Sequence, residues 1–233
     1  MELKPKHLLV TLLLCFLFKK CRPLCQVQTD PNLGIRTMCT LSKISEGEPL
    51  DFELKEPPYL YLTVDEGEIP ENTFEHVRPT KELWFIGVNI TYIQPGAFKH
   101  LATLKSLAVS NTSVETLSKN TFEGLQTLKT LALGNNKIKT IEDGAFLGLT
   151  NLDQLILDDN RITRLEEKTF DGLKFLRGLF LNNNPIEYIH DSALQNVKEL
   201  THLTISIVQG KNVSERALQL PRVFQLRIFY LVE

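Results

Sequence analysis

Apolar residues recur along this chain with one long period, far longer than the period of a single helix or strand. One column consists of every 24th residue: Phe74, Phe98, Phe122, Phe146, Phe170, Leu194 and Leu218. A second column has the same period: Leu83, Leu107, Leu131, Leu155, Leu179 and Leu203. Independent columns that share one period indicate tandem structural repeats.

Within a repeat, the spacing of apolar and polar positions predicts a short strand followed by a turn. In residues 128–151, Leu131 and Leu133 alternate with Ala132, which is the period of a strand. Asn136 follows where the chain should leave that strand. Further apolar residues complete the unit: Ile138, Ile141, Phe146 and Leu149. Because no repeat can bury its apolar side alone, adjacent repeats must stack.

This pattern, LxxLxLxxNxIxxIxxxxFxxLxx, resembles the 24-residue repeat typical of extracellular leucine-rich-repeat proteins. The resemblance covers roughly residues 56–232 and is strongest over residues 104–197. It implies an α/β leucine-rich-repeat solenoid, curved and right-handed, with short parallel strands on the concave face. The convex face would carry mostly loops and short helical turns. The resemblance also implies a hydrogen-bonded ladder of Asn136, Asn160 and Asn184, since an amide both donates and accepts.

The repeat pattern weakens toward both ends of the array. Val88, Thr112 and Val208 stand where the ladder would have asparagine, so we expect less rigid turns there. A last strand is predicted over residues 223–229, with Leu226 and Ile228 facing inward. Because an exposed strand edge invites pairing, we expect either a truncated sequence or a partner that covers this edge.

The N-terminus resembles a targeting segment. Residues 1–20 predict a signal peptide, with cleavage between residues 20 and 25, because a basic start precedes the apolar run of residues 8–18. That run is about half the length needed to span a bilayer. An uncleaved anchor and a wrongly assigned start are the alternatives. No later stretch of the sequence is long and apolar enough to span a membrane.

Residues 21–55 are predicted to form an N-terminal cap, and residues 56–233 an array of about seven repeats plus a partial eighth. All cysteines lie near the N-terminus: Cys15, Cys21, Cys25 and Cys39. In an oxidising compartment, one disulfide plus one free or removed thiol is the simplest outcome. We prefer the pair Cys25–Cys39, because Cys21 lies close to the cleavage point. The cap resembles the usual four-cysteine cap of the family only loosely.

Charge and motifs limit the function classes. The chain has 26 basic and 28 acidic residues and a net charge of -2, which argues against nucleic-acid binding and against electrostatic membrane binding. Its histidines are scattered, and no phosphate-binding loop occurs. The acidic pair Asp158 and Asp159 is not followed by the alternating oxygen ligands of a calcium loop. We therefore expect no catalytic residue, no metal and no cofactor.

Three N-x-S/T sequons predict N-glycosylation: Asn89, Asn111 and Asn212. Such triplets also arise by chance, so unmodified polar turn residues are the alternative at each site. Together with a signal peptide, the sequons predict an extracellular glycoprotein.

The concave face is the predicted binding surface. The strand register places six candidate ligand-binding residues on it: Trp84, Ile86, Ile156, Asp158, Phe180 and Asn182. Four of these are apolar and are expected to be exposed, and exposed apolar and aromatic groups often mark recognition surfaces. Packing of Trp84 on an adjacent side chain or on the cap is the alternative. A glycan on Asn111 would cover part of the face.

The sequence therefore predicts a secreted protein-binding module of a recognition, adhesion or innate-immune type. The alternative is a structural subunit, or a truncated receptor ectodomain, that associates through its C-terminal strand. An enzyme would need a further catalytic domain. An intracellular scaffold would follow if the apolar start were not a signal peptide. The fold alone does not separate these functions.

Overall fold

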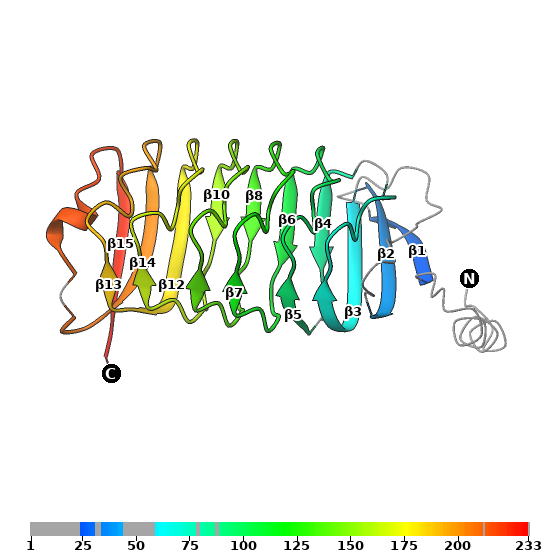
Figure 1. Cartoon of the computed structure of the whole chain (residues 1–233), viewed down its shortest axis with the longest axis horizontal. Helices are drawn as coiled ribbons and strands as arrows, with labels where there is room; N and C mark the ends of the chain where they lie inside the picture. Colours follow the sequence, from blue (N-terminus) through cyan, green and yellow to red (C-terminus); the bar gives the residue numbers. More distant parts are fainter. Residues whose placement is uncertain are drawn as a thin grey trace.

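The computed structural model describes residues 24–30, 34–43, 59–77, 80–86, 89–211 and 213–232. Successive turns of the chain stack into an elongated coil, with β1 at one end and β15 at the other (Figure 1). Its main element is an eleven-stranded sheet in the order β1-β2-β3-β4-β6-β8-β10-β12-β14-β15, with β5 paired to β3. The strands of the main path are Leu24–Asp30, Gly34–Lys43, Tyr59–Ile69, Glu82–Phe85, Ser106–Val109, Thr130–Ala132, Gln154–Ile156, Gly178–Ile186, His202–Val208 and Gln225–Leu231.

The strand register follows the period of the sequence. From β2 onward, each strand runs parallel to the next strand along this path. Leu107 pairs with Leu83 on one side and with Leu131 on the other. A strand that returns to the same place after each full turn of a coil has to be parallel to the preceding strand. The predicted solenoid with one strand per repeat is therefore confirmed.

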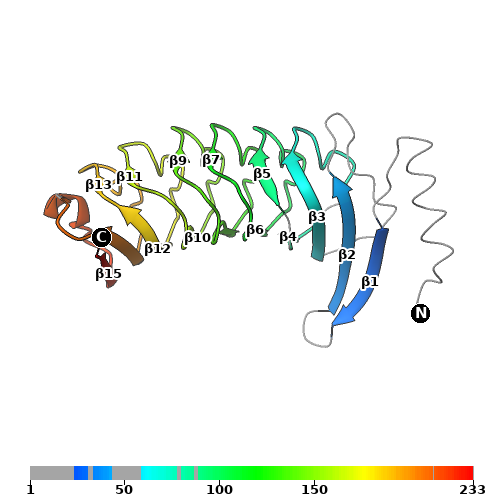
Figure 2. The same ribbon diagram turned by 90° about the horizontal axis from the view of Figure 1, so that it is seen from below.

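A second set of short strands lines another side of the coil (Figure 2). It consists of β5 (Ile90–Ile93), β7 (Thr116–Leu117), β9 (Thr140–Ile141), β11 (Arg164–Leu165) and β13 (Tyr188–Ile189). β7 pairs with β9 and β11 with β13, both in parallel. Within the described ranges the helical content is one 3-10 turn, η1, at Glu215–Leu218. None of the described helices is long and apolar enough to cross a membrane.

A stack of phenylalanine rings fills the interior. Successive rings of the column from Phe74 to Phe170 lie 5.7, 6.2, 6.0 and 6.3 Å apart and within 17° of parallel. All five rings are buried. The column continues as buried Leu194 and then as only partly buried Leu218. Aromatic packing is therefore replaced by smaller side chains at the C-terminal end, where the repeat pattern also weakens.

The predicted asparagine ladder is present in the structure. Asn160 accepts a hydrogen bond from the Ile138 N–H (3.0 Å) and donates to the carbonyls of Leu133 (2.9 Å) and Leu157 (3.0 Å). Asn136 and Asn184 bond in the same manner one repeat to either side. Each amide thus satisfies buried backbone groups of two adjacent coils.

The positions that lack the ladder asparagine differ from one another. The side chain of Thr112 contacts Asn136 through its hydroxyl (2.5 Å to Oδ1). Val208 is a buried residue at the end of β14. Val88 lies outside the described residues. The looser turns predicted for these repeats stay a prediction.

The N-terminal strands extend the sheet. β1 and β2 form an antiparallel pair in which Cys25 stands directly opposite Cys39, and β2 pairs with β3 in parallel. Cys39 is buried and disulfide-bonded. The role of residues 21–55 as an N-terminal cap stays a prediction. Residues 1–20, the predicted signal peptide, lie outside the described residues.

The strand predicted over residues 223–229 is present as β15, and its register with β14 places Leu226 beside Leu203 and Ile228 beside Ile205. Leu226 is nevertheless 41% exposed. The reason is that no other described strand follows β15 in the sheet. Phe224, Phe229 and Tyr230 are also exposed.

Candidate functional site

The concave face is formed by the outward side chains of the long sheet, and its N-terminal part carries an aromatic patch. Trp84 on β4 and Ile86 just after it are 37% and 42% exposed. The Trp84 ring stacks on Tyr61 of β3, with centroids 6.1 Å apart and an interplanar angle of 22°. The Trp84 indole N–H donates to Glu82 Oε2 at 3.1 Å. Trp84 therefore packs on a neighbour and still presents an open, oriented surface.

The middle of the face has only small side chains. Ala108 and Gly134 are buried, while Ala132 and Ser110 are partly exposed. The Ser110 hydroxyl donates to the Ala132 carbonyl at 3.3 Å. A Cβ at Gly134 would lie 3.3 Å from the carbonyl oxygen of Asp158. Side chains therefore project little from the backbone along this part of the face.

Two of the predicted apolar residues are less exposed than expected. Ile156 and Phe180 are half-buried. A Cβ added at Gly178 would lie 3.0 Å from Phe180 Cε2, so the phenyl ring lies over the backbone of its own strand. Both side chains were expected to be exposed and are instead partly buried. Both still belong to the face.

A polar cluster follows these residues. Asp158 Oδ1 accepts a hydrogen bond from the Asn182 backbone N–H at 2.6 Å, and Asn182 Nδ2 donates to the Thr204 hydroxyl at 2.9 Å. Burial raises the pKa of Asp158 above its ordinary value, and the Asn182 hydrogen bonds offset part of that shift. Asn182 Oδ1 is buried without a donor among the described residues. The cluster is therefore an acceptor-rich part of the face.

A column of left-handed residues marks the rim of this face, and the sequence-based prediction missed it. Asn111, Asn135, Asp159 and Asn183 have φ between 54° and 60°. Asparagine and aspartate tolerate this conformation better than other residues with a Cβ. The missed signal was that these residues precede the ladder position in consecutive repeats. The sequon residue Asn111 is thus a strained turn residue as well as an exposed one.

Two of the three sequon asparagines lie among the described residues. Asn89 and Asn111 are both exposed. Asn212 lies outside the described residues. Exposure is necessary for a glycan, and both described sites meet that condition.

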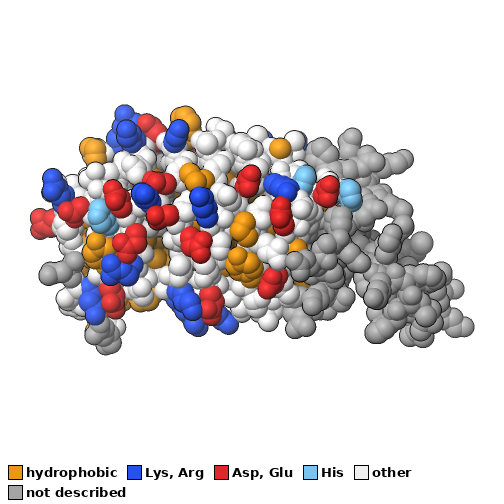
Figure 3. Space-filling model, in the orientation of Figure 1, with side chains coloured by type: hydrophobic (Ala, Val, Ile, Leu, Met, Phe, Trp, Pro, Cys, Tyr) orange, Lys and Arg blue, Asp and Glu red, His pale blue; other side chains and the backbone are white. Residues whose placement is uncertain are grey.

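Within the described ranges, no three His, Cys, Asp or Glu side chains lie close enough to hold a metal ion. Acidic and basic side chains alternate over the face seen in Figure 3, without a patch of one sign. The expected absence of catalytic residues, metal and cofactor stays a prediction.

The comparisons with known proteins agree with this geometry. A family model described as leucine rich repeat matches residues 102–162 and 150–206. These residues are therefore leucine-rich repeats, and the leucine-rich-repeat resemblance of the sequence is confirmed over them. No curated protein matches the chain.

Solved structures show the same fold. One is the crystal structure of a TLR13–ssRNA13 complex, with 21% identity and a TM-score of 0.54, covering 76% of this chain and 29% of that chain. Another is an octameric complex of Latrophilin 3, Unc5D and FLRT2 (LRR), with 21% identity and a TM-score of 0.57, covering 75% and 60%. This chain therefore spans less than two thirds of either relative.

Proposed function

We propose that this protein is a secreted leucine-rich-repeat module that binds a protein through its concave face. The observation that carries the proposal is the aromatic patch of Tyr61, Trp84 and Ile86. Trp84 and Ile86 are more than a third exposed although the array buries most of its apolar side chains. Exposed aromatic and aliphatic groups on a rigid surface are typical of protein-binding hot spots.

The other predicted residues complete this face. Ile156 and Phe180 supply further apolar surface, and Asp158 and Asn182 supply hydrogen-bond acceptors toward a partner. The small residues between the two groups let a partner approach the backbone closely. One structural relative supports a protein-binding role, because it assembles with Latrophilin 3 and Unc5D, whereas the other is bound to single-stranded RNA. The balanced charge favours a protein partner over RNA.

Secretion is the first part to test. The tagged full chain would be expressed in animal cells, and its intact mass measured in the medium before and after glycan removal. We expect loss of about 20 residues, glycans at Asn89 or Asn111, and a disulfide between Cys25 and Cys39 in non-reduced peptides. Full-length, unmodified protein held in the cytosol would contradict this proposal.

The face is tested by paired variants in a screen against displayed extracellular proteins. Trp84→Glu places a charge in the patch and is expected to weaken binding about 30-fold or more, as loss of a hot spot does. Leu147→Glu is the matched control, since Leu147 is 41% exposed but lies outside the concave face. Circular dichroism checks the fold of both. A partner that binds the two variants equally would place the binding surface elsewhere.

A second candidate function is assembly through β15. This strand pairs with β14 on one edge, no described strand pairs with its other edge, and its neighbourhood includes Phe224 and Tyr230, which are 70% and 66% exposed. An edge of this kind pairs readily with another strand. We expect concentration-dependent dimers in sedimentation velocity, abolished by Leu226→Lys. A protein that stays monomeric at every concentration would exclude assembly of this kind.

A further inference from the structure

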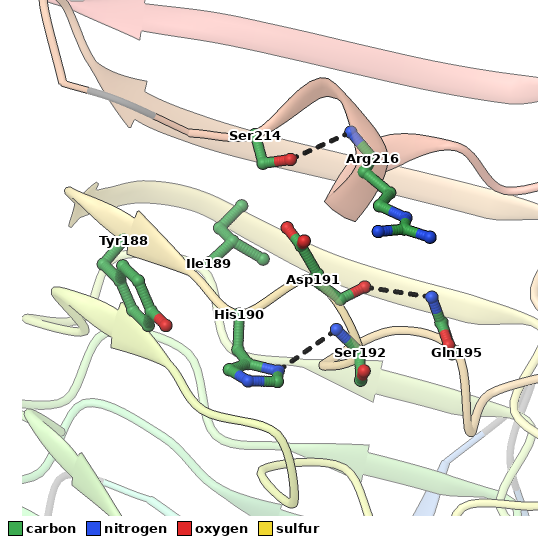
Figure 4. A pocket seen from close by; sticks show the side chains of 8 residues that line it. All are labelled: Tyr188, Ile189, His190, Asp191, Ser192, Gln195, Ser214 and Arg216. Carbon is green, nitrogen blue, oxygen red and sulfur yellow. Dashed lines mark hydrogen bonds between the residues drawn. The ribbon is translucent and has the colours of Figure 1, made fainter.

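A polar cleft lies between β13 and η1, away from the concave face. Its volume is about 550 Å³, and it is lined by residues 188–192 and Gln195 on one side and by Ser214 and Arg216 on the other. Figure 4 shows Arg216 reaching from η1 toward the segment that carries Asp191. The volume is within the range of small-ligand sites, roughly 300–1,000 Å³.

The cleft exists because the seventh repeat departs from the pattern. His190 N–H donates to the Leu165 carbonyl of the preceding repeat. In the next repeat, Lys211 N–H donates to Val208 and Val213 N–H to Lys211, so the chain turns locally. No described strand therefore pairs with the second edge of β13. Because backbone directions alternate along a strand, the N–H and carbonyl of Ile189 face the cleft.

The polar groups around the cleft are available to a ligand. Neither Asp191 nor Arg216 forms an ion pair with any other described residue. Gln195 donates to the backbone carbonyl of Asp191, which leaves the carboxylate open. His190 Nδ1 accepts a hydrogen bond from the Ser192 N–H at 3.1 Å, so the neutral ring carries its proton on Nε2.

The charge balance of the cleft favours a ligand without net charge. Asp191 only accepts and Arg216 only donates hydrogen bonds, and their charges cancel. An anion would meet Asp191 and a cation would meet Arg216, so either one carries a repulsive contact. Adjacent hydroxyl groups, each able to donate and accept, satisfy both side chains without charge. Recognition rests on these polar groups, because Ile189 is only 3% exposed and Arg164 lies over the Tyr188 ring, 4.1 Å from its centroid.

We propose that this cleft binds a neutral carbohydrate, as a single hexose or the end of a glycan chain. The carboxylate of Asp191 accepts from two ring hydroxyls, and Arg216 donates to a neighbouring one. Ser192, Ser214 and the His190 Nε2–H complete the ring of hydrogen-bonding groups. The site is separate from the concave face and does not depend on it.

Saturation-transfer NMR and calorimetry on the deglycosylated full chain test this proposal. The probes are the methyl glycosides of glucose, galactose and mannose, and N-acetylglucosamine, each up to about 50 mM, which detects affinities in the millimolar range. Sodium acetate and ethylammonium chloride are the charged probes. We expect at least one sugar to bind, and neither ion to compete with it.

Variants locate the site. Arg216→Ala and Asp191→Ala are each expected to weaken sugar binding about tenfold or more, which corresponds to about 1.4 kcal/mol. Arg177→Ala, at another exposed arginine, and Trp84→Ala, on the concave face, should leave it unchanged. The proposal is overturned if no sugar binds, if acetate or ethylammonium competes, or if the cleft variants bind normally. Sugar binding that fails only in Trp84→Ala would instead assign the sugar to the concave face.

Discussion

At the scale of single residues, buried amides connect adjacent coils of the backbone. Asn160 makes hydrogen bonds to Ile138, Leu133 and Leu157, all of them in the interior. No apolar side chain of similar size can replace both its donor and its acceptor. The array therefore depends on these amides for more than packing.

Substituting Asn160→Ala should lower the free energy of unfolding by about 3 kcal/mol, because buried backbone groups lose their partners. Urea denaturation measures the change. Asn151→Ala is the control, since Asn151 is exposed and bonds only to the Gln126 carbonyl. A change at Asn160 as small as that at Asn151 would contradict the structural role of the ladder.

Asp158 should make stability depend on pH. Burial raises its pKa in the folded state, so the folded protein holds this proton more tightly than the unfolded chain does. As pH rises from the ordinary aspartate pKa through the raised pKa of Asp158, the contribution of this residue to the free energy of unfolding therefore falls. Above the raised pKa that contribution no longer changes with pH. Asp158→Asn removes this loss while keeping an acceptor for the Asn182 N–H. Its stability relative to the natural protein should rise over that pH interval.

The Glu115→Gln variant serves as a control, because its stability relative to the natural protein should change with pH in the opposite direction. The hydrogen bond and the charge of Lys139, 2.7 Å away, lower the pKa of Glu115. The stabilisation that ionised Glu115 gives the folded state is present above the ordinary glutamate pKa, and it is lost as pH falls through the lowered pKa. Denaturation series of both variants between pH 3 and pH 7 compare the two signs. A difference that falls with rising pH for Asp158→Asn, as it should for Glu115→Gln, would refute the assignment for Asp158.

At the scale of elements, each turn must leave room for the backbone of the coil beside it. Gly124 has φ +90°, and a Cβ there would lie 2.4 Å from Lys99 Cα and from its carbonyl oxygen. Neither atom can move without displacing the adjacent coil. Gly210 also has a positive φ, +81°, but no atom lies within 4 Å of its Cβ position.

Gly124→Ala should therefore lower the unfolding free energy by about 3 kcal/mol, combining conformational strain with overpacking. Gly210→Ala carries only the conformational strain, about 1–2 kcal/mol. Thermal and urea unfolding of the two variants measure the difference. If both variants lost the same unfolding free energy, the contact of the added Cβ with Lys99 would not destabilise the fold.

The elements also show what the sequence could predict. The strands around Leu107, Leu131 and Leu155 follow from the period alone, because identical spacing forces identical positions in each coil. The phenylalanine column and the asparagine ladder follow for the same reason. All of these features depend on a residue and on its equivalent one repeat away, which a sequence displays directly.

The features that escaped prediction depend on the path of the chain between repeats. The half-burial of Phe180 results from the position of its ring over Gly178. The cleft beside β13 results from the local turn at Lys211, where the pattern stops. The residue spacing shows where the repeat pattern stops, but it does not predict that a cleft forms there. The candidate concave face could thus be predicted by residue, and the cleft could not.

At the scale of the whole molecule, each described strand of the sheet bonds only to the strands of the adjacent coils. Stability is then a sum of terms within each repeat and between neighbours. The phenylalanine stack strengthens the interactions between neighbouring repeats in the middle of the array. Its replacement by Leu194 and Leu218 weakens the corresponding interactions at the C-terminal end. Loss of structure on heating should therefore begin near η1 and β15.

The neighbour-only connectivity has a mechanical consequence. A load applied to the two ends of the coil acts along its long axis, so it reaches the interfaces between coils one after another. Each coil that peels away releases about 80 Å of extended chain, since a residue spans at most about 3.3–3.6 Å. The protein would lengthen in steps, retaining its inner coils while the outer ones yield. Attached between two surfaces, it would behave as an extensible tether.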